Sequence, residues 1–151
     1  MTKRFLLVDD DTDDRDMFRE ALSKVDATII CHCTSDGKEL FETLDSKDFL
    51  LPDIIYLDVN MSGMNGWECL TKLKATEAYR HIPVFMYSTS SQQQDADIAL
   101  DMGALCFFTK PHDFNQLKEI LEVIANNLGG NIMEAVGKYE GIKTHKMFAC
   151  S

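Results

Sequence analysis

The most informative segment of the chain reads Phe5-Leu6-Leu7-Val8-Asp9-Asp10-Asp11, an apolar run that passes directly into three acids. Short runs that are apolar throughout are typical of strands buried on both faces of a parallel sheet. Four further runs of this kind follow along the chain, at 28–33, 54–57, 84–87 and 105–108. The sequence therefore predicts five strands, the first of which ends in carboxylates.

Segments with helical periodicity lie between these runs and after the last one. The clearest is Phe114, Leu117, Leu121, Ile124 and Leu128, in which apolar residues are spaced by threes and fours. The order reads (βα) five times, and each parallel connection needs a crossover helix. We therefore expect an α/β domain with a doubly wound, five-stranded parallel sheet.

Length and charge restrict the classes of function. The 151 residues fit a single domain. The formal net charge is −10, and the sequence has no Lys/Arg cluster that could bind a nucleic-acid backbone. No apolar run approaches the ~18 residues of a membrane span, and the first strand begins too early for a signal peptide. We expect a cytoplasmic protein with no direct nucleic-acid binding and no membrane insertion.

The five cysteines are an odd number, and Cys31, Cys33, Cys69 and Cys106 sit inside apolar segments, which is typical of reduced, buried thiols. Alternation along a strand would point both thiols of Cys31-His32-Cys33 to one face. A structural zinc site usually needs four ligands, so this triplet alone does not predict one.

The residues that follow the strands are the candidates for function, because ligands of open α/β sheets lie beyond the carboxyl ends of the strands. Asp9, Asp10 and Asp58 supply carboxylates there, while Ser88 and Lys110 supply a hydroxyl and an ammonium. Crowded carboxylates repel unless a cation lies between them, and an all-oxygen set favours Mg²⁺. Ser88 and Lys110 could then contact phosphoryl oxygens on Asp58.

Each of these residues also has a structural explanation when it is taken alone. Acids at the start of a helix cap its free N–H groups, and we assign Asp11, Asp13 and Asp14 to that role instead of the metal. Helix capping does not explain why four strand ends each carry a residue type that suits phosphoryl transfer.

From residue 3 to 128 the chain resembles the receiver domain of two-component response regulators. Asp9-Asp10 is similar to the family's acidic pair, and Leu57-Asp58-Val59-Asn60 begins a segment similar to its phosphorylation loop. Pro83 to Ser88 and Phe107 to Pro111 are similar to its two later signatures. The resemblance implies the flavodoxin-like strand order 2-1-3-4-5, with a receiver domain over 1–128 and a C-terminal extension over 129–151.

The resemblance also implies roles for individual residues. Asp58 would be the phosphoacceptor and Lys110 its counter-charge. Mg²⁺ would be held by Asp10 directly, by Asp9 mainly through water, by Asp58 and by the backbone carbonyl of Asn60. Ser88 and Phe107 would form the switch that responds to phosphorylation. The peptide bond between Lys110 and Pro111 would be cis, as it is in the family.

The function implied is that of a single-domain response regulator, which is not an enzyme beyond promoting its own phosphorylation and dephosphorylation. Its partners would be a sensor histidine kinase or a histidine phosphotransfer protein, and a downstream protein target; a homodimer is also allowed. Residues 129–151 are too few for an output domain, although Ile132, Met133, Val136, Met147 and Phe148 could dock on a surface. A weaker similarity, through Tyr79 to Pro83, indicates the regulators that partner bacterial phytochrome-type kinases.

Two other classes of protein remain as alternatives. Asp9-x-Asp11 after an apolar strand also resembles the opening of haloacid-dehalogenase-like phosphatases, in which Asp9 would be the nucleophile. Such enzymes need a further acidic pair after the lysine, and the acids that follow Lys110 most closely are Asp113 and Glu119. The other alternative is a phosphorylation-independent interaction module, which would be expected to lose an acid or the lysine.

Overall fold

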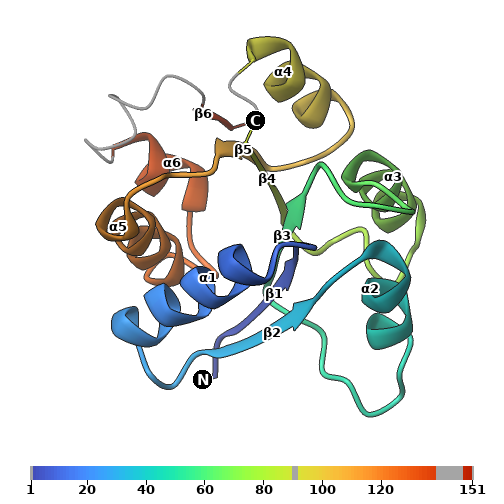
Figure 1. Cartoon of the computed structure of the whole chain (residues 1–151), viewed down its shortest axis with the longest axis horizontal. Helices are drawn as coiled ribbons and strands as arrows, with labels where there is room; N and C mark the ends of the chain where they lie inside the picture. The colour runs from blue at the N-terminus through green and yellow to red at the C-terminus, as the bar shows by residue number, and fades with distance from the viewer. Residues whose placement is uncertain (1, 90–91, 139–147, 151) are drawn as a thin grey trace.

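The computed structural model describes residues 2–89, 92–138 and 148–150. Its elements are, in chain order, β1 (Arg4–Val8), α1 (Thr12–Val25), β2 (Ile30–Thr34), α2 (Gly37–Leu44), β3 (Ile54–Asp58), α3 (Gly66–Ala75), β4 (Val84–Ser88), α4 (Gln93–Asp101), β5 (Cys106–Thr109), α5 (Phe114–Ala125), α6 (Ile132–Gly137) and β6 (Phe148–Cys150). Figure 1 shows the sheet at the centre, with helices on both of its sides.

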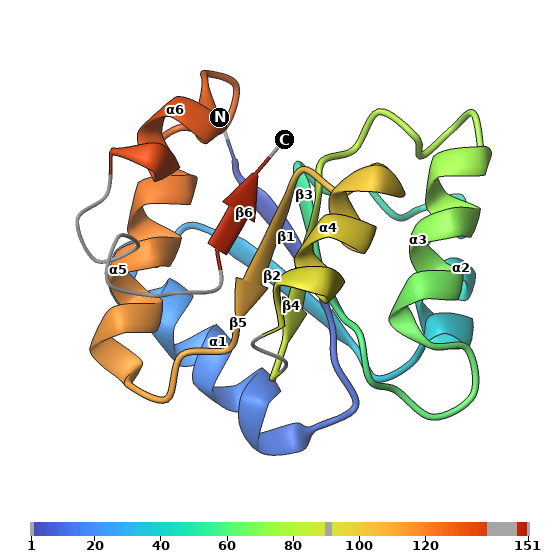
Figure 2. The same ribbon diagram turned by 90° about the horizontal axis from the view of Figure 1, so that it is seen from above.

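Five strands pair in parallel in the order β2-β1-β3-β4-β5, so the predicted fold class and strand order are confirmed. The second strand starts at Ile30 rather than at residue 28, because the backbone N–H and the hydroxyl of Thr28 both donate to the Asp26 carboxylate in a turn. A sixth strand that the sequence did not predict, β6, pairs antiparallel with β5. Figure 2 shows β6 beside β5 at this edge of the sheet.

The sheet separates two apolar clusters, one on each face. Helices α1 and α5 cover one cluster, which contains Phe18 and Leu121 and is rich in aromatic rings around Tyr56. Helices α2, α3 and α4 cover the other, which contains Leu40 and Leu70. Burial on both faces explains why β3 and β4 are buried along their whole length. Among the described residues, no helix is both long and apolar enough to cross a bilayer.

The described part of the C-terminal extension packs on the domain. Ile132 and Val136 of α6 are buried in the cluster beneath α1 and α5, whereas Met133 is exposed. Met147 lies outside the described residues, as does the side chain of Phe148. The boundary at residue 128 stays a prediction.

Two details differ from the expectations. The described residues contain no cis peptide bond, so the bond between Lys110 and Pro111 is trans, the isomer that an X–Pro bond ordinarily prefers. Cys31, Cys33 and Cys69 are free, but Cys106 is disulfide-bonded and not the reduced thiol that its apolar surroundings suggested.

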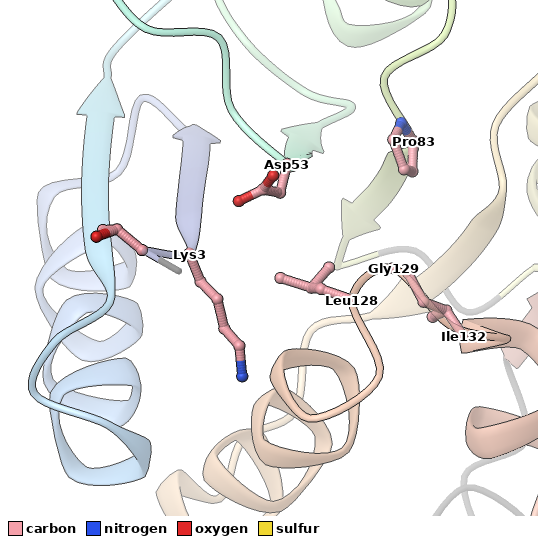
Figure 3. Close-up of a pocket in the computed structure, with 7 residues that line it drawn as sticks. Lys3, Asp53, Pro83, Leu128, Gly129 and Ile132 are labelled. Carbon is pink, nitrogen blue, oxygen red and sulfur yellow. The ribbon is translucent and has the colours of Figure 1, made fainter.

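One pocket, with a volume of about 420 Å³, lies where the chain enters β1, β3 and β4. It is lined by Lys3, Asp53 and Pro83 on the sheet side and by Leu128 and Ile132 after α5. Figure 3 shows the Asp53 carboxylate and the Leu128 side chain among the groups that line it. The pocket is at the amino-terminal ends of the strands, so it is separate from the edge at which the predicted site residues lie.

Candidate functional site

Three carboxylates meet at the carboxyl ends of β1 and β3. Asp9 is fully buried, Asp58 is 4% exposed and Asp10 is exposed. Each can place an oxygen within 4.8 Å of the other two. The three acids predicted from the sequence are therefore brought together, and they could hold a metal ion. The set contains only oxygen ligands, which suits a hard divalent cation.

The backbone around Asp9 fixes the position of its side chain. The Asp9 N–H donates to the carbonyl of Thr34 at the end of β2 (3.1 Å), and Arg15 donates to the Asp9 carbonyl (2.7 Å). One carboxylate oxygen of Asp9 accepts from the Asp11 N–H (3.0 Å). Asp11 itself caps α1, since its side chain accepts from the Asp14 N–H, as the sequence predicted.

The loop after Asp58 is held close to the start of α3 by Gly66. The Gly66 N–H donates to the Val59 carbonyl (2.9 Å), and a Cβ at position 66 would lie 2.3 Å from the Asp58 carbonyl oxygen. Only glycine permits this approach. Gly66 was not among the residues predicted to form the site, although a glycine immediately after the helix cap Asn65 is a detectable signal.

Lys110 lies among the acids, and its ion pairs extend beyond the one expected with Asp58. Its Nζ is 2.8 Å from Asp9 Oδ2, 2.8 Å from Asp14 Oδ2 and 3.6 Å from Asp58 Oδ1. From the sequence, Lys110 was expected beside Asp58, and Asp14 was expected only at the start of α1. Asp14 does lie in the first turn of α1, and from there it reaches across to Lys110.

The electrostatic environment shifts the pKa of both Lys110 and Asp58. Burial by itself lowers the pKa of Lys110, but the hydrogen bonds to Asp14 and Asp9 outweigh it and hold the pKa above its ordinary value. For Asp58, burial raises the pKa to about 7, against the opposing effect of the Lys110 charge. Asp9 and Asp10 raise it further, whereas a backbone hydrogen bond from Asn60 lowers it. The site is therefore unfavourable for a third negative charge.

The remaining predicted residues lie on β4, on β5 and in the loop after β3. Ser88 ends β4 and is fully buried, and its carbonyl accepts from the Lys110 N–H at 2.6 Å. Phe107 is fully buried in the cluster beneath α2, α3 and α4, while Asn60 lies exposed in the loop after β3. Tyr87, which the sequence analysis did not select, places its ring 5.4 Å from Lys110 Nζ.

The geometry and the sequence agree with a family of known proteins. The model of the response regulator receiver domain matches residues 5–122 of the chain. The chain belongs to this family. The match includes the carboxylates at the strand ends and Lys110. These residues therefore belong to a receiver domain of a two-component system, and the chain is not a haloacid-dehalogenase-like phosphatase by family.

Two relatives differ in how much of their own length the chain covers. A protein-glutamate methylesterase/protein-glutamine glutaminase of Methanosarcina mazei is 32% identical, and the alignment covers 98% of this chain and 43% of that protein. The chemotaxis protein CheY1 of Helicobacter pylori is 29% identical over 80% of this chain and 95% of that protein. The chain thus spans less than half the length of the methylesterase relative and almost the whole length of CheY1.

Solved structures of receiver domains have the same fold. The phosphorylated cyanobacterial phytochrome response regulator RcpA superposes with a TM-score of 0.74 at 28% identity, covering 81% of this chain and 90% of that one. The Mn²⁺-bound form of response regulator Rcp1 gives a TM-score of 0.69 at 25% identity, over 82% and 92% of the two chains.

Proposed function

We propose that the chain is a phosphorylation switch in which Asp58 accepts a phosphoryl group from a phosphohistidine of a sensor histidine kinase or phosphotransfer protein. The observation that carries the proposal is the position of Asp58, a buried carboxylate with two acids and Lys110 around it. An aspartate in such surroundings can act as a nucleophile, because the neighbouring positive charge offsets the charge of the incoming group.

We assign the binding of Mg²⁺ to Asp9, Asp10 and Asp58 and to the backbone carbonyl of Asn60. The oxygen-only ligand set fits this ion, and the Mn²⁺-bound form of Rcp1 shows that a structurally similar receiver takes up a divalent cation. When bound, the ion supplies positive charge against the carboxylates and the phosphoryl oxygens.

In the proposed phosphoryl transfer, the side chains of Asp58, Lys110 and Ser88 have separate roles. An Asp58 carboxylate oxygen forms the new bond to phosphorus while the bond between phosphorus and the histidine nitrogen breaks, and the nitrogen keeps the electron pair. Lys110 is close enough to Asp58, at 3.6 Å, to contact the transferred group after a small movement. The Ser88 hydroxyl would donate to a phosphoryl oxygen.

We further propose that Ser88 and Phe107 transmit the change to the surface formed by α4, β5 and α5. Phe107 pairs with Met86 in the β4–β5 ladder, two residues before Ser88, so a shift of Ser88 reaches Phe107 through paired strands. The signal would leave by contact with a protein target, with no enzymatic reaction on another substrate. We also propose that this switch acts in the cytoplasm, and a homodimer is compatible with it.

A phosphatase that uses Asp9 as its nucleophile is disfavoured by the contacts of Asp9. Its Oδ1 accepts from the Asp11 N–H and its Oδ2 accepts from Lys110. Both oxygens are thus engaged, and the buried side chain is not presented to a substrate.

The test is intact-mass analysis of the full chain after incubation with acetyl phosphate and Mg²⁺, beside the variant Asp58→Asn. We expect one hydroxylamine-sensitive phosphoryl group per chain in the native protein and none in the variant. The exposed variant Asp48→Asn serves as the matched control and should be modified like the native chain. Equal modification of Asp58→Asn would contradict the proposal, absence of modification in every protein would favour an interaction module, and continuous phosphate release from esters would favour a phosphatase.

A further inference from the structure

A pair of thiols lies outside the acidic site, on strand β2 at the edge of the sheet. Cys31 and Cys33 point to the same face of the strand, with their Sγ atoms 3.9 Å apart. Both are half-buried, and Arg19 of α1 donates from Nε to Cys33 Sγ at 3.1 Å. The Cys33 sulfur therefore lies between the Cys31 sulfur and the Arg19 guanidinium.

These two neighbours favour negative charge on Cys33. The hydrogen bond from Cys31 lowers the pKa of Cys33 most, burial opposes it, and Arg19 and Arg15 lower it further, so that the pKa falls to about 7. The hydrogen bond to Cys33 and burial raise the pKa of Cys31. Within this pair, deprotonation is therefore favoured at Cys33 over Cys31, and a cysteine with a lowered pKa beside a guanidinium is an activated nucleophile.

Cys69 provides a contrast within the same chain. It is fully buried, and burial raises its pKa to about 11, so its thiol stays protonated at neutral pH. The difference between the two cysteines follows from their neighbours, because Cys69 has no contact like that between Arg19 and Cys33 among the hydrogen bonds of the described residues.

A metal ion fits the thiol pair poorly. His32 points to the opposite face of β2, where its ring lies 5.3 Å from that of Phe49. In the described part of the chain, the one group of three side chains close enough to share an ion is the acidic cluster of Asp9, Asp10 and Asp58. Two thiols without further ligands do not make a structural zinc site.

A bond between the two cysteines is also disfavoured by the strand. Same-face neighbours on an extended strand are about 6.6 Å apart at Cα, near the upper limit for a disulfide. The two sulfur atoms would have to approach from 3.9 Å to about 2 Å, which would bend β2 away from its pairing with β1.

We propose that Cys33 is a thiol–disulfide exchange site for a small disulfide that carries carboxylate groups. The Cys33 thiolate attacks one sulfur of that disulfide, a bond forms between Cys33 and this sulfur, and the other sulfur leaves as a thiolate with the electron pair. No further oxidant is needed. The exposed guanidinium of Arg19 can pair with a carboxylate of the reagent.

The test follows the reaction of the full chain with glutathione disulfide at neutral pH, by mass spectrometry of the peptide 25–38, whose fragments distinguish Cys31 from Cys33. The same cysteines in urea serve as the reference. A half-buried thiol with an ordinary pKa reacts more slowly in the folded chain than in the unfolded chain. We expect Cys33 to react about fivefold faster in the folded chain, because its larger thiolate fraction outweighs the lower nucleophilicity of a weaker base.

Variants separate activation from simple exposure. Arg19→Gln should lower the folded rate severalfold, whereas Arg80→Gln, which removes an exposed arginine on another segment, should leave it unchanged. Equal thermal unfolding of both variants will establish that the fold is intact. The proposal fails if the adduct forms on Cys31, if Arg19→Gln does not change the rate, or if the product is a bond between Cys31 and Cys33 without glutathione.

Discussion

The replacement Asp58→Asn removes a buried negative charge that the fold tolerates poorly, and we expect it to stabilise the protein when divalent metal is chelated. Burial raises the pKa of Asp58 to about 7 from an ordinary value of 3.8. At about 1.4 kcal/mol per pKa unit, this difference corresponds to about 4 kcal/mol against the folded state above neutral pH. We take this as an upper limit and expect a gain of about 2 kcal/mol, because the neighbouring Asp10 is exposed and solvent screens part of the charge.

The sign of the pH dependence follows from linkage. Above pH 7, Asp58 is charged in both the folded and the unfolded chain, so only the folded chain bears the cost. As the pH falls from 7 towards 3.8, the folded chain takes up a proton that the unfolded chain does not yet bind, and stability rises. The advantage of Asp58→Asn should therefore be largest near pH 8 and should shrink steadily towards pH 4.

The assay is urea unfolding, supported by thermal melts, in buffers with EDTA at several pH values. A gain of about 2 kcal/mol corresponds to roughly 4–8 °C in melting temperature for a domain of this size. The exposed loop variant Asp48→Asn should stay within about 0.5 kcal/mol of the native chain. With saturating Mg²⁺ the advantage of Asp58→Asn should diminish, because binding to the native carboxylates stabilises the folded state. A native chain as stable as Asp58→Asn in EDTA at pH 8 would refute this reasoning.

Two further substitutions test other contacts of the site. Gly66→Ala would place a Cβ 2.3 Å from the Asp58 carbonyl oxygen, and we expect it to lower the free energy of unfolding by about 3 kcal/mol and to slow phosphorylation. Asp14→Asn removes one of the two acids that contact Lys110 at 2.8 Å, and Lys110 should then spend more time beside Asp58. We expect phosphorylation by acetyl phosphate to become about threefold faster, which equals about 0.6 kcal/mol.

Each of these two substitutions has a matched control. Gly137→Ala adds a Cβ with nothing within 4 Å, so its stability should change by less than about 0.5 kcal/mol. Asp13→Asn removes an exposed acid from the same turn of α1 and should leave the phosphorylation rate unchanged. If Gly66→Ala unfolds like the native chain, or if Asp13→Asn and Asp14→Asn have the same rate, the corresponding contact does not have the role given to it.

The parallel sheet and the acids at its edge could be predicted from the sequence, because both follow from local patterns of residues. An apolar run of four or five residues predicts a buried strand. Parallel strands then bring Asp9 and Asp58 to the same edge of the sheet, independently of how the helices pack. The carboxylates that pair with the Lys110 ammonium could not be predicted from local sequence patterns. Its flexible side chain reaches three carboxylates, at 2.8 Å, 2.8 Å and 3.6 Å, and the choice among them depends on differences in distance of less than about 1 Å.

Strand β6 shows a second kind of limit. Its three residues have no periodicity that separates them from a loop, and they become a strand only because β5 offers an edge on which to pair. The disulfide of Cys106 was missed for a similar reason, since an apolar neighbourhood predicts burial of a thiol but does not reveal whether another cysteine is within reach.

The contacts of Lys110 connect the proposed chemistry to the proposed switch. Its ammonium is held at 2.8 Å by Asp9 and Asp14 and lies 3.6 Å from Asp58, so a shift of about 1 Å is enough to exchange one partner for another. A phosphoryl group on Asp58 adds negative charge on the side that Lys110 contacts least and thereby favours this shift. The Lys110 N–H is bonded to the Ser88 carbonyl, so a movement of Lys110 acts directly on the end of β4. Because β4 and β5 are paired as far as Ser88 and Thr109, we expect the same movement to reach Phe107 and the face built from α4, β5 and α5.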